Sequence, residues 1–230
     1  MTDLTVLDNP IWHSLTTAHR KLSRRHGLAC RYPKDVSPLA AMQSPSAQAY
    51  EDLRALVGAD EGVGLFTAEP LDVPSDWQVA RARLIDQMIC TQLSAPAPAG
   101  AIPEIQTLQA ADVPEMLALT AATEPGPFLV DTIRMGRYFG IRASDGRLIA
   151  MAGERLRLND FVEISAVCTD PEFRGQGHAR TLMTFLTAQI LADGKAPILH
   201  VKSDNGAKLL YEQLGFRVRR AMHLSVLTLG

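Results

Sequence analysis

The chain has 230 residues, with 25 acidic and 23 basic side chains and a formal net charge of −2. Hydrophobic residues make up 47% and charged residues 21%, the balance of a globular protein that buries a core without help from a metal or a disulfide. No block of like charges interrupts the sequence, which argues against an electrostatic binder of nucleic acid or of a membrane surface.

The cysteines and the N-terminus narrow the class of protein further. Cys30, Cys90 and Cys168 are odd in number and far apart, and none belongs to a C-x-x-C pair, so neither a disulfide framework nor a metal site is expected. The first residues place no basic region before a long apolar run, and no stretch approaches the ~18 apolar residues of a membrane span. We therefore expect a cytoplasmic protein.

The N-terminal part of the chain has a mixed pattern. Residues 48–57 suit a helix, residues 63–67 suit a strand, and residues 79–88 suit either element. Pro and Ala then alternate through residues 94–103, which have nothing to bury and indicate an extended linker. The predicted first domain is thus an α/β segment of residues 1–93, either a degenerate half-copy of the domain that follows or a lid over it.

Residues 104–230 form the second predicted domain and have sharper signals. Asp112 is a suitable N-cap for the first of two consecutive helices, and Ser144-Asp145-Gly146 is a hairpin turn between apolar segments. From Gly177 onwards, apolar residues recur at helical spacing. A short helix is predicted at residues 206–214, after the long helix that begins at Gly177. The predicted strands are residues 105–108, 139–142, 147–152, 161–168, 199–202 and 216–227. This order predicts a mixed sheet covered by helices, an α/β fold.

The turn before the long helix is the segment that points to chemistry. The first amides of a helix have no partners inside the helix and carry the positive end of its dipole, so after a glycine turn they can bind a pyrophosphate. Gly175 and Gly177 have no Cβ, which lets a phosphate approach closely, and Arg174 and Arg180 can add charge-assisted contacts. Glycines alone would favour an ordinary turn, so the decision rests on the wider sequence.

Two motifs around this turn occur in a diagnostic order. Arg174-x-x-Gly177-x-Ala179 follows a strand that ends in Val167-Cys168-Thr169-Asp170-Pro171, and Leu210-Tyr211-Glu212-Gln213-Leu214-Gly215-Phe216 comes one helix and one strand later. The first resembles the R/Q-x-x-G-x-G/A turn, and the second the LYExLGF segment, of the GNAT superfamily of acyl-CoA-dependent N-acyltransferases. The resemblance covers roughly residues 104–230 and leaves the first hundred residues unexplained.

The resemblance implies that an acetyl group moves from acetyl-CoA to a primary amine by direct attack in a ternary complex. The amides of residues 176–180 would bind the pyrophosphate, and the strand before the turn would pair with the pantetheine arm and polarise the thioester carbonyl. Family members often have an asparagine seven residues before the tyrosine; here Asp204 stands there and Asn205 is next to it, with Asn205 preferred. The implied cofactor-binding residues are Val167, Cys168, Thr169, Arg174, Gly175, Gln176, Gly177, His178, Ala179, Arg180 and Asn205.

Two residues are candidates for proton transfer. The resemblance implies that Tyr211 is the general acid that protonates the departing thiolate, although its helical spacing also suits a core tyrosine. Glu163 lies on the strand that leads to Val167 and is the candidate base for the amine, with partial burial expected to raise its pKa. The alternative for Glu163 is a solvated or salt-bridged strand residue.

The acceptor side is less defined. The loop at residues 123–128 falls between the two predicted helices, and Pro125, Gly126 and Phe128 are its candidate acceptor-binding residues, although a plain connection fits equally. The acceptor would be a small amine or a peptide, and the protein a monomer or a homodimer. Two rival functions are a non-catalytic acyl-CoA-binding module and a Rossmann nucleotide binder, the latter disfavoured because the turn is not G-x-G-x-x-G.

Overall fold

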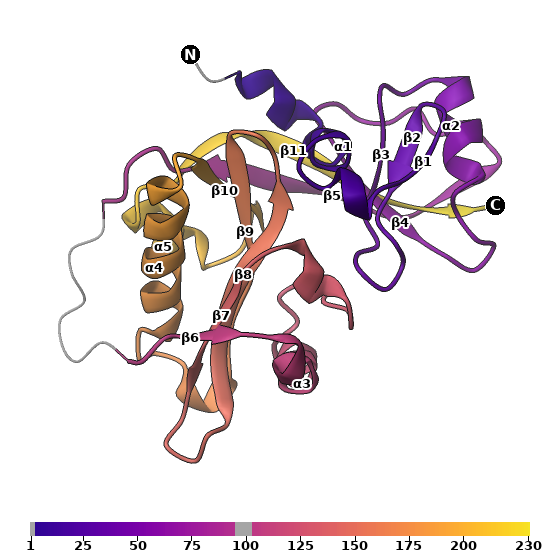
Figure 1. The fold of residues 1–230 in the computed structure, drawn as a ribbon. Coiled ribbons are helices and arrows are strands. Elements are labelled where there is room, and N and C mark those ends of the chain that lie inside the picture. Colours follow the sequence, from indigo (N-terminus) through magenta and orange to yellow (C-terminus); the bar gives the residue numbers. More distant parts are fainter. Residues whose placement is uncertain (1–2, 95–102) are drawn as a thin grey trace.

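A computed structural model describes residues 3–94 and 103–230 of the protein. Eight strands form one mixed sheet in the order β4-β11-β5-β10-β9-β8-β7-β6 (Figure 1). The strands are β4 (Val63–Thr67), β5 (Trp77–Ile89), β6 (Gln106–Leu108), β7 (Tyr138–Arg142), β8 (Leu148–Arg157), β9 (Phe161–Thr169), β10 (Ala196–Lys202) and β11 (Arg217–Leu229). The predicted mixed α/β fold is therefore confirmed.

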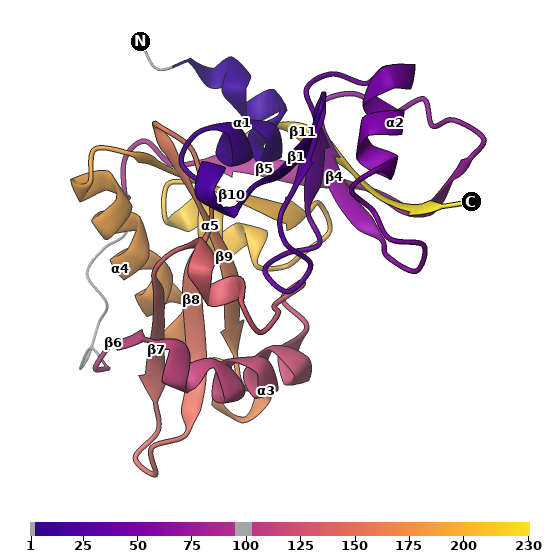
Figure 2. The ribbon, with the colours of Figure 1, turned by 45° about the vertical axis from the view of Figure 1, so that its right-hand side comes forward.

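Helices cover both faces of this sheet. Helix α3 (Val113–Thr123) and helix α4 (His178–Ala192) both contact β8 and β9, from opposite sides (Figures 1 and 2). Consecutive residues of β7 point to opposite faces of the sheet. Tyr138 packs with the buried residues of α3, and Phe139 packs with those of α4. Helix α5 (Lys208–Gln213) leads into β11 through Gly215, whose φ of +100° belongs to the left-handed region that favours glycine.

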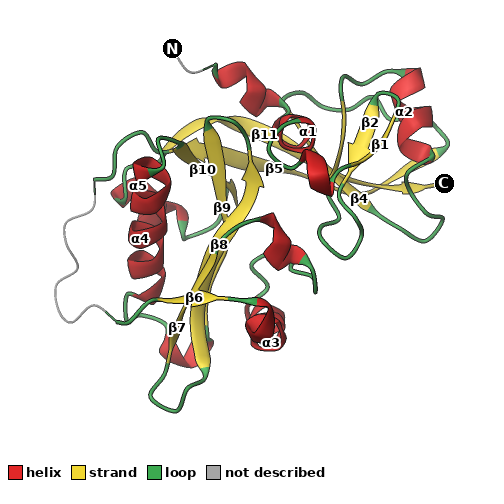
Figure 3. Ribbon diagram, viewed as in Figure 1, coloured by secondary structure: helices red, strands yellow, loops and turns green. Residues whose placement is uncertain are grey.

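The N-terminal part of the chain contributes its own small layer and two strands of the main sheet. Helices α1 (Pro10–Thr16) and α2 (Ala47–Arg54) accompany a small sheet of β1 (Arg24–His26), β2 (Ala29–Arg31) and β3 (Ala40–Met42) (Figure 3). Beyond it, β4 pairs with β11, and β5 lies between β10 and β11. The two predicted domains therefore share one sheet. Their division at residues 94–103 stays a prediction, and residues 95–102 lie outside the described part.

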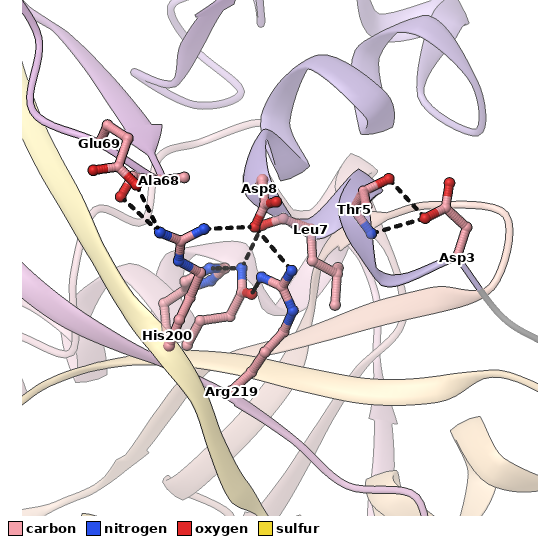
Figure 4. A network of polar contacts seen from close by, with 10 residues as sticks. Asp3, Thr5, Leu7, Asp8, Ala68, Glu69, His200 and Arg219 are labelled. Carbon is pink, nitrogen blue, oxygen red and sulfur yellow. Dashed lines mark hydrogen bonds and ion pairs between the residues drawn. The ribbon is translucent and has the colours of Figure 1, made fainter.

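A polar network ties the two ends of the chain together beside this shared sheet (Figure 4). Asp8 pairs with Arg219 at 2.8 Å and with Arg220 at 3.1 Å. Gln87 of β5 accepts a hydrogen bond from Arg219 at 2.9 Å and donates to the carbonyl of Leu7 at 2.8 Å. These contacts join residues that are 80 or more positions apart, so the N-terminal segment is fastened to β11 by charge as well as by strand pairing.

Two local expectations differ from the structure. Only one α-helix, α3, lies between β6 and β7, and a 3-10 turn at Thr132–Met135 stands where a second helix was expected. Asp112 is the N-cap residue of α3, but its carboxylate makes no cap bond; it accepts from the amide of Gln109 at 2.7 Å and pairs with Arg142 at 2.6 Å. In the part of the chain that the structure describes, no helix has the length and apolar character needed to cross a membrane.

Candidate active site

The centre of the candidate site is a fork between two parallel strands. β9 and β10 pair only from Phe161 opposite Ala196 to Glu163 opposite Ile198, and they diverge afterwards. Just past the fork, β9 bulges: its register against β8 shifts, and Ala166 has a φ of +53°. The left-handed conformation costs a non-glycine residue about 1–2 kcal/mol and is found where surrounding structure enforces it, often at functional sites. The fork thus exposes backbone groups of β9 to a cleft.

The glycine turn follows at the end of β9. Gly177 is the N-cap of α4 with a φ of +82°, and Gly175 has a φ of +77°, so both positions require the freedom of glycine. A Cβ added to either residue would meet no atom of the described residues within 4 Å, its two chain neighbours apart. The turn borders a pocket of about 280 Å³, lined by Thr169, Phe173, Arg174, Gly175, Gly177, His178, Ala179, Arg180 and Leu210. The predicted cofactor turn therefore faces open space.

Polar atoms without partners at this turn suit an anionic ligand. Within residues 3–94 and 103–230, both ring nitrogens of His178 and the hydroxyl of Thr169 are buried and make no hydrogen bond. Buried polar groups are normally satisfied, so these atoms fit a site that a phosphate-bearing ligand completes. Arg174 donates to the carbonyl of Thr169 at 3.3 Å, and Arg180 donates to the side chain of Gln213. Arg180 is thus partly engaged by the protein itself.

A second, larger cleft of about 1250 Å³ continues from the turn to the N-terminal segment. It receives Val167 and Cys168 of β9, His200 and Lys202 of β10, and Tyr211 of α5. Tyr211 is 9% exposed, burial raises the pKa of its phenol, and its hydroxyl makes no hydrogen bond to any described residue. A phenol that stays protonated and donates no hydrogen bond to the described residues is suited to donate its proton to a ligand.

The choice between Asp204 and Asn205 also has a structural basis. Asn205 lines the large cleft, while Asp204 is absent from its described wall. The side-chain oxygen of Asn205 accepts from the amide of Ala207 at 2.9 Å, which leaves its NH₂ group as the free donor. Asn205 is therefore placed to donate a hydrogen bond into the cleft.

Glu163 differs from its predicted environment. Its carboxylate is fully buried and accepts two hydrogen bonds from Arg155, at 2.8 and 2.6 Å, and one from His200 Nδ1 at 2.7 Å. Burial alone would raise the pKa of Glu163, but attraction and hydrogen bonds from Arg155 and His200 outweigh it and hold the pKa well below its ordinary range. The expected rise in pKa is wrong, because the sequence does not show that a cation is buried beside the carboxylate.

His200 is also held at both ring nitrogens. Gln87 accepts from Arg219 through its oxygen, so its NH₂ group faces His200 Nε2, 2.9 Å away. From this network we assign the ring hydrogen to Nδ1, which donates it to Glu163. Since Glu163 is the last residue of β9 paired with β10, the Arg155–Glu163–His200 chain braces the fork at the point where the strands separate.

We expect Glu163→Gln to lower the free energy of unfolding by about 3–5 kcal/mol at pH 7, because it leaves the buried guanidinium of Arg155 without its counter-ion. The contribution of Glu163 is complete above its unfolded pKa of about 4.3 and is lost as the pH falls towards the lower folded pKa. The difference between variant and parent should therefore shrink in acid. Urea unfolding at several pH values measures this; Glu172→Gln, on an exposed side chain, is the control, and a parental stability for Glu163→Gln at pH 7 would contradict the brace.

The acceptor loop and Cys168 complete the predicted residues. Pro125, Gly126 and Phe128 all line the large cleft. Phe128 is 8% exposed and packs edge-on against Tyr138, with ring centroids 5.6 Å apart, so it belongs to the α3 core as well. Burial raises the pKa of the Cys168 thiol to about 11, which keeps it protonated at neutral pH and unsuited to a covalent acyl intermediate.

One wall of the cleft had no counterpart among the predicted site residues. It is formed by the shared part of the sheet, where β4, β5 and β11 contribute Gly64, Phe66, Arg81, Arg83, Ile85, Leu224 and Val226. No motif marks these positions. The available signal was the alternation of residues 81, 83 and 85, which indicates one face of a strand, but residues 79–88 suited a helix equally.

Comparisons with known proteins show what this chain and its fold are similar to. The model of the FR47-like protein family matches residues 138–224, from β7 into β11. A candidate acetyltransferase from the GNAT family of Novosphingobium aromaticivorans is 40% identical in sequence, and the match covers 97% of this chain and 98% of that one with a TM-score of 0.87. The match therefore includes the N-terminal segment that the sequence motifs left unexplained.

Two more distant structures share the fold alone. A GCN5-related N-acetyltransferase from Kribbella flavida is 18% identical, with 94% of this chain and 93% of that chain covered and a TM-score of 0.63. A GCN5-related N-acetyltransferase-like protein from Streptococcus suis is 14% identical, with 96% and 92% covered and a TM-score of 0.58. Among curated proteins, no match was found.

Proposed function

The chain belongs to the GNAT family, and from that premise we propose that it transfers an acetyl group from acetyl-CoA to a primary amine by direct attack in a ternary complex. The observation that carries the proposal is the continuity of the site: the glycine turn, the β9–β10 fork and Tyr211 border connected space. A donor bound by its phosphates at the turn would reach the fork with its thioester.

The proposal divides the work among the residues at the turn and the fork. The free amides at the start of α4, together with His178 and Thr169, would bind the pyrophosphate. Backbone groups of Val167 and its neighbours on bulged β9 would pair with the pantetheine arm, and Asn205 would donate to it from the other side. These contacts would hold the thioester in place for attack, and such positioning can itself lower the barrier substantially.

The reaction needs one proton delivered to the departing thiolate and one removed from the amine nitrogen, which would pass to solvent water in the open cleft. As the amine nitrogen bonds to the acetyl carbon, the carbon–sulfur bond breaks, and Tyr211 would protonate the departing thiolate. A backbone donor at the β9 bulge would stabilise the oxyanion that forms on the carbonyl oxygen. Glu163 would act indirectly as a positioning residue, because its proton-accepting oxygens are occupied by Arg155 and His200.

A screen of primary amines with acetyl-CoA tests the function, with the released thiol as the signal and the acetylated amine identified by mass. Thiol release that depends on both substrates is expected. Binding of acetyl-CoA without thiol release from any amine would favour the non-catalytic acyl-CoA-binding module instead.

Gly177→Val should weaken acetyl-CoA binding by roughly 100-fold or more, because the new side chain occupies the space at the turn and its φ is strained. Gly194→Val is the matched control: Gly194 also has a positive φ, +72°, and open space around it, but it follows the far end of α4. Calorimetric titration of both folded variants separates backbone strain from loss of the site. Equal affinities in the two variants would remove the turn from the cofactor site.

A further inference from the structure

The wall of the cleft built by the N-terminal segment has an ordered surface. Two rows of residues cross the strands there: Phe66 lies opposite Leu224, which lies opposite Arg83, and Gly64 lies opposite Val226, which lies opposite Arg81. All six line the cleft, as alternation along each strand requires of residues on one face. Each row thus ends in an arginine on β5, next to apolar side chains.

The side chains of these two arginines have no partner among the residues that the structure describes. Within residues 3–94 and 103–230, neither the Arg81 nor the Arg83 side chain makes a hydrogen bond or an ion pair, although Arg83 is half-buried. Arg155 in the same cleft is different, because Glu163 holds it with two hydrogen bonds. Glu124 is the single carboxylate among the described lining residues, and it comes from the end of α3. The β5 wall therefore presents uncompensated positive charge.

The arginines belong to a different region from the cofactor turn. Neither borders the pocket around Gly177. The last pair between β5 and β10 is Ile85 with Lys202, and Arg83 and Arg81 lie two and four residues further along β5. At about 3.3 Å per residue, they are ~7 and ~13 Å beyond that pair. An anion bound there would be separate from the turn at Gly177 and would share the large cleft with the candidate acceptor loop at residues 123–128.

We propose that Arg81 and Arg83 form a subsite for an anionic group, a carboxylate or a phosphate, carried by the amine acceptor. Guanidinium groups bind both anions through paired hydrogen bonds, and a partly dehydrated arginine such as Arg83 binds them more strongly than an exposed one. Leu224 and Val226 would contact the carbon chain between the anion and the amine. The proposal rests on the proposed function and gives the acceptor a chemical class: a primary amine with an anion several bonds away from its nitrogen.

The test uses ω-amino acids and the amino alcohols of matched length, from three to six carbons, with O-phosphoethanolamine and ethanolamine as the phosphate pair. For each, thiol release gives kcat/KM with acetyl-CoA, and calorimetry gives the dissociation constant in the presence of CoA. The full-length protein should favour one class of anionic amine over its alcohol. The class and the chain length that show the largest preference identify the anion.

Arg83→Gln, alone and with Arg81→Gln, should weaken binding of the anionic acceptor by roughly 10- to 100-fold. The loss should appear in KM and not in kcat, and the binding of the alcohols and of acetyl-CoA should stay unchanged. Arg83→Lys should restore part of the preference, because it keeps the charge without the paired geometry. Arg24→Gln, which removes an exposed arginine of β1 outside the cleft, is the control and should behave as the parent does.

The two measurements, calorimetry and thiol release, test the anion subsite and the transferase activity separately. The subsite would be overturned if the parent bound the anionic amines and the alcohols equally well. It would also be overturned if the double variant kept the same preference for the anionic amines as the parent. A preference that calorimetry detects and the double variant loses, with no thiol release from any amine, would support the subsite and refute the transferase activity.

Discussion

A chain truncated to begin at Ala101 should fail to fold cooperatively. The truncation removes β5, the strand that lies between β10 and β11. In the full chain, β5 pairs with residues Ile198 to Lys202 of β10 and with β11 along nearly its whole length. Met88 and Cys90 would leave the core that packs under α4, and Arg219 and Arg220 would lose Asp8. Two hydrophobic strand edges would then face water, which favours aggregation.

Thermal unfolding followed by circular dichroism, together with gel filtration, measures this loss. The matched control is the same truncated chain produced together with residues 1–100 as a separate chain, which should restore a folded complex because every strand is again present. A truncated chain that unfolds cooperatively at the parental temperature on its own would show that the N-terminal segment is an independent appendage.

Tyr211→Phe should lower kcat by about 10²–10⁴-fold and leave the affinity for acetyl-CoA unchanged. The substitution removes only a hydroxyl that no described residue hydrogen-bonds, and it keeps the ring that packs against Phe216. Stability should therefore stay near the parental value. Burial raises the pKa of the Tyr211 phenol above the ordinary tyrosine pKa of about 10. The phenol therefore stays protonated at least up to about pH 10, and its ionisation should not lower the parental rate below that pH.

Tyr50→Phe is the control for this substitution, because the hydroxyl of Tyr50 is also without a partner among the described residues but lies in the N-terminal core, away from the cleft. Single-turnover measurements would ensure that the chemical step is observed. Parental kcat in Tyr211→Phe under those conditions would make Tyr211 a core residue that happens to border the cleft.

Features that depend on neighbouring residues were accessible from the sequence. Residues 63–67 form β4 as predicted, the hairpin turn at Ser144-Asp145-Gly146 joins β7 to β8, and the long helix begins beside Gly177. Each rests on a local cause: alternation of side chains, the need for glycine at a positive φ, or an apolar stripe at helical spacing. The order of the two motifs around Gly177 and Tyr211 likewise predicted the family, because a cofactor turn and the helix beyond it are short segments.

Features that depend on distant pairing were decided by the tertiary structure. Residues 79–88 carried no clear period because β5 is buried on both faces at one end and exposed at the other, and its partners β10 and β11 lie more than one hundred residues away. The same distance hid the row that sets Arg83 opposite Leu224. Arg155 is only eight residues from Glu163, but its burial beside that carboxylate depends on how other elements pack over the β8–β9 hairpin. Spacing along a chain reports which side a residue takes in its own element, whereas the charge it meets there depends on which elements pack against it.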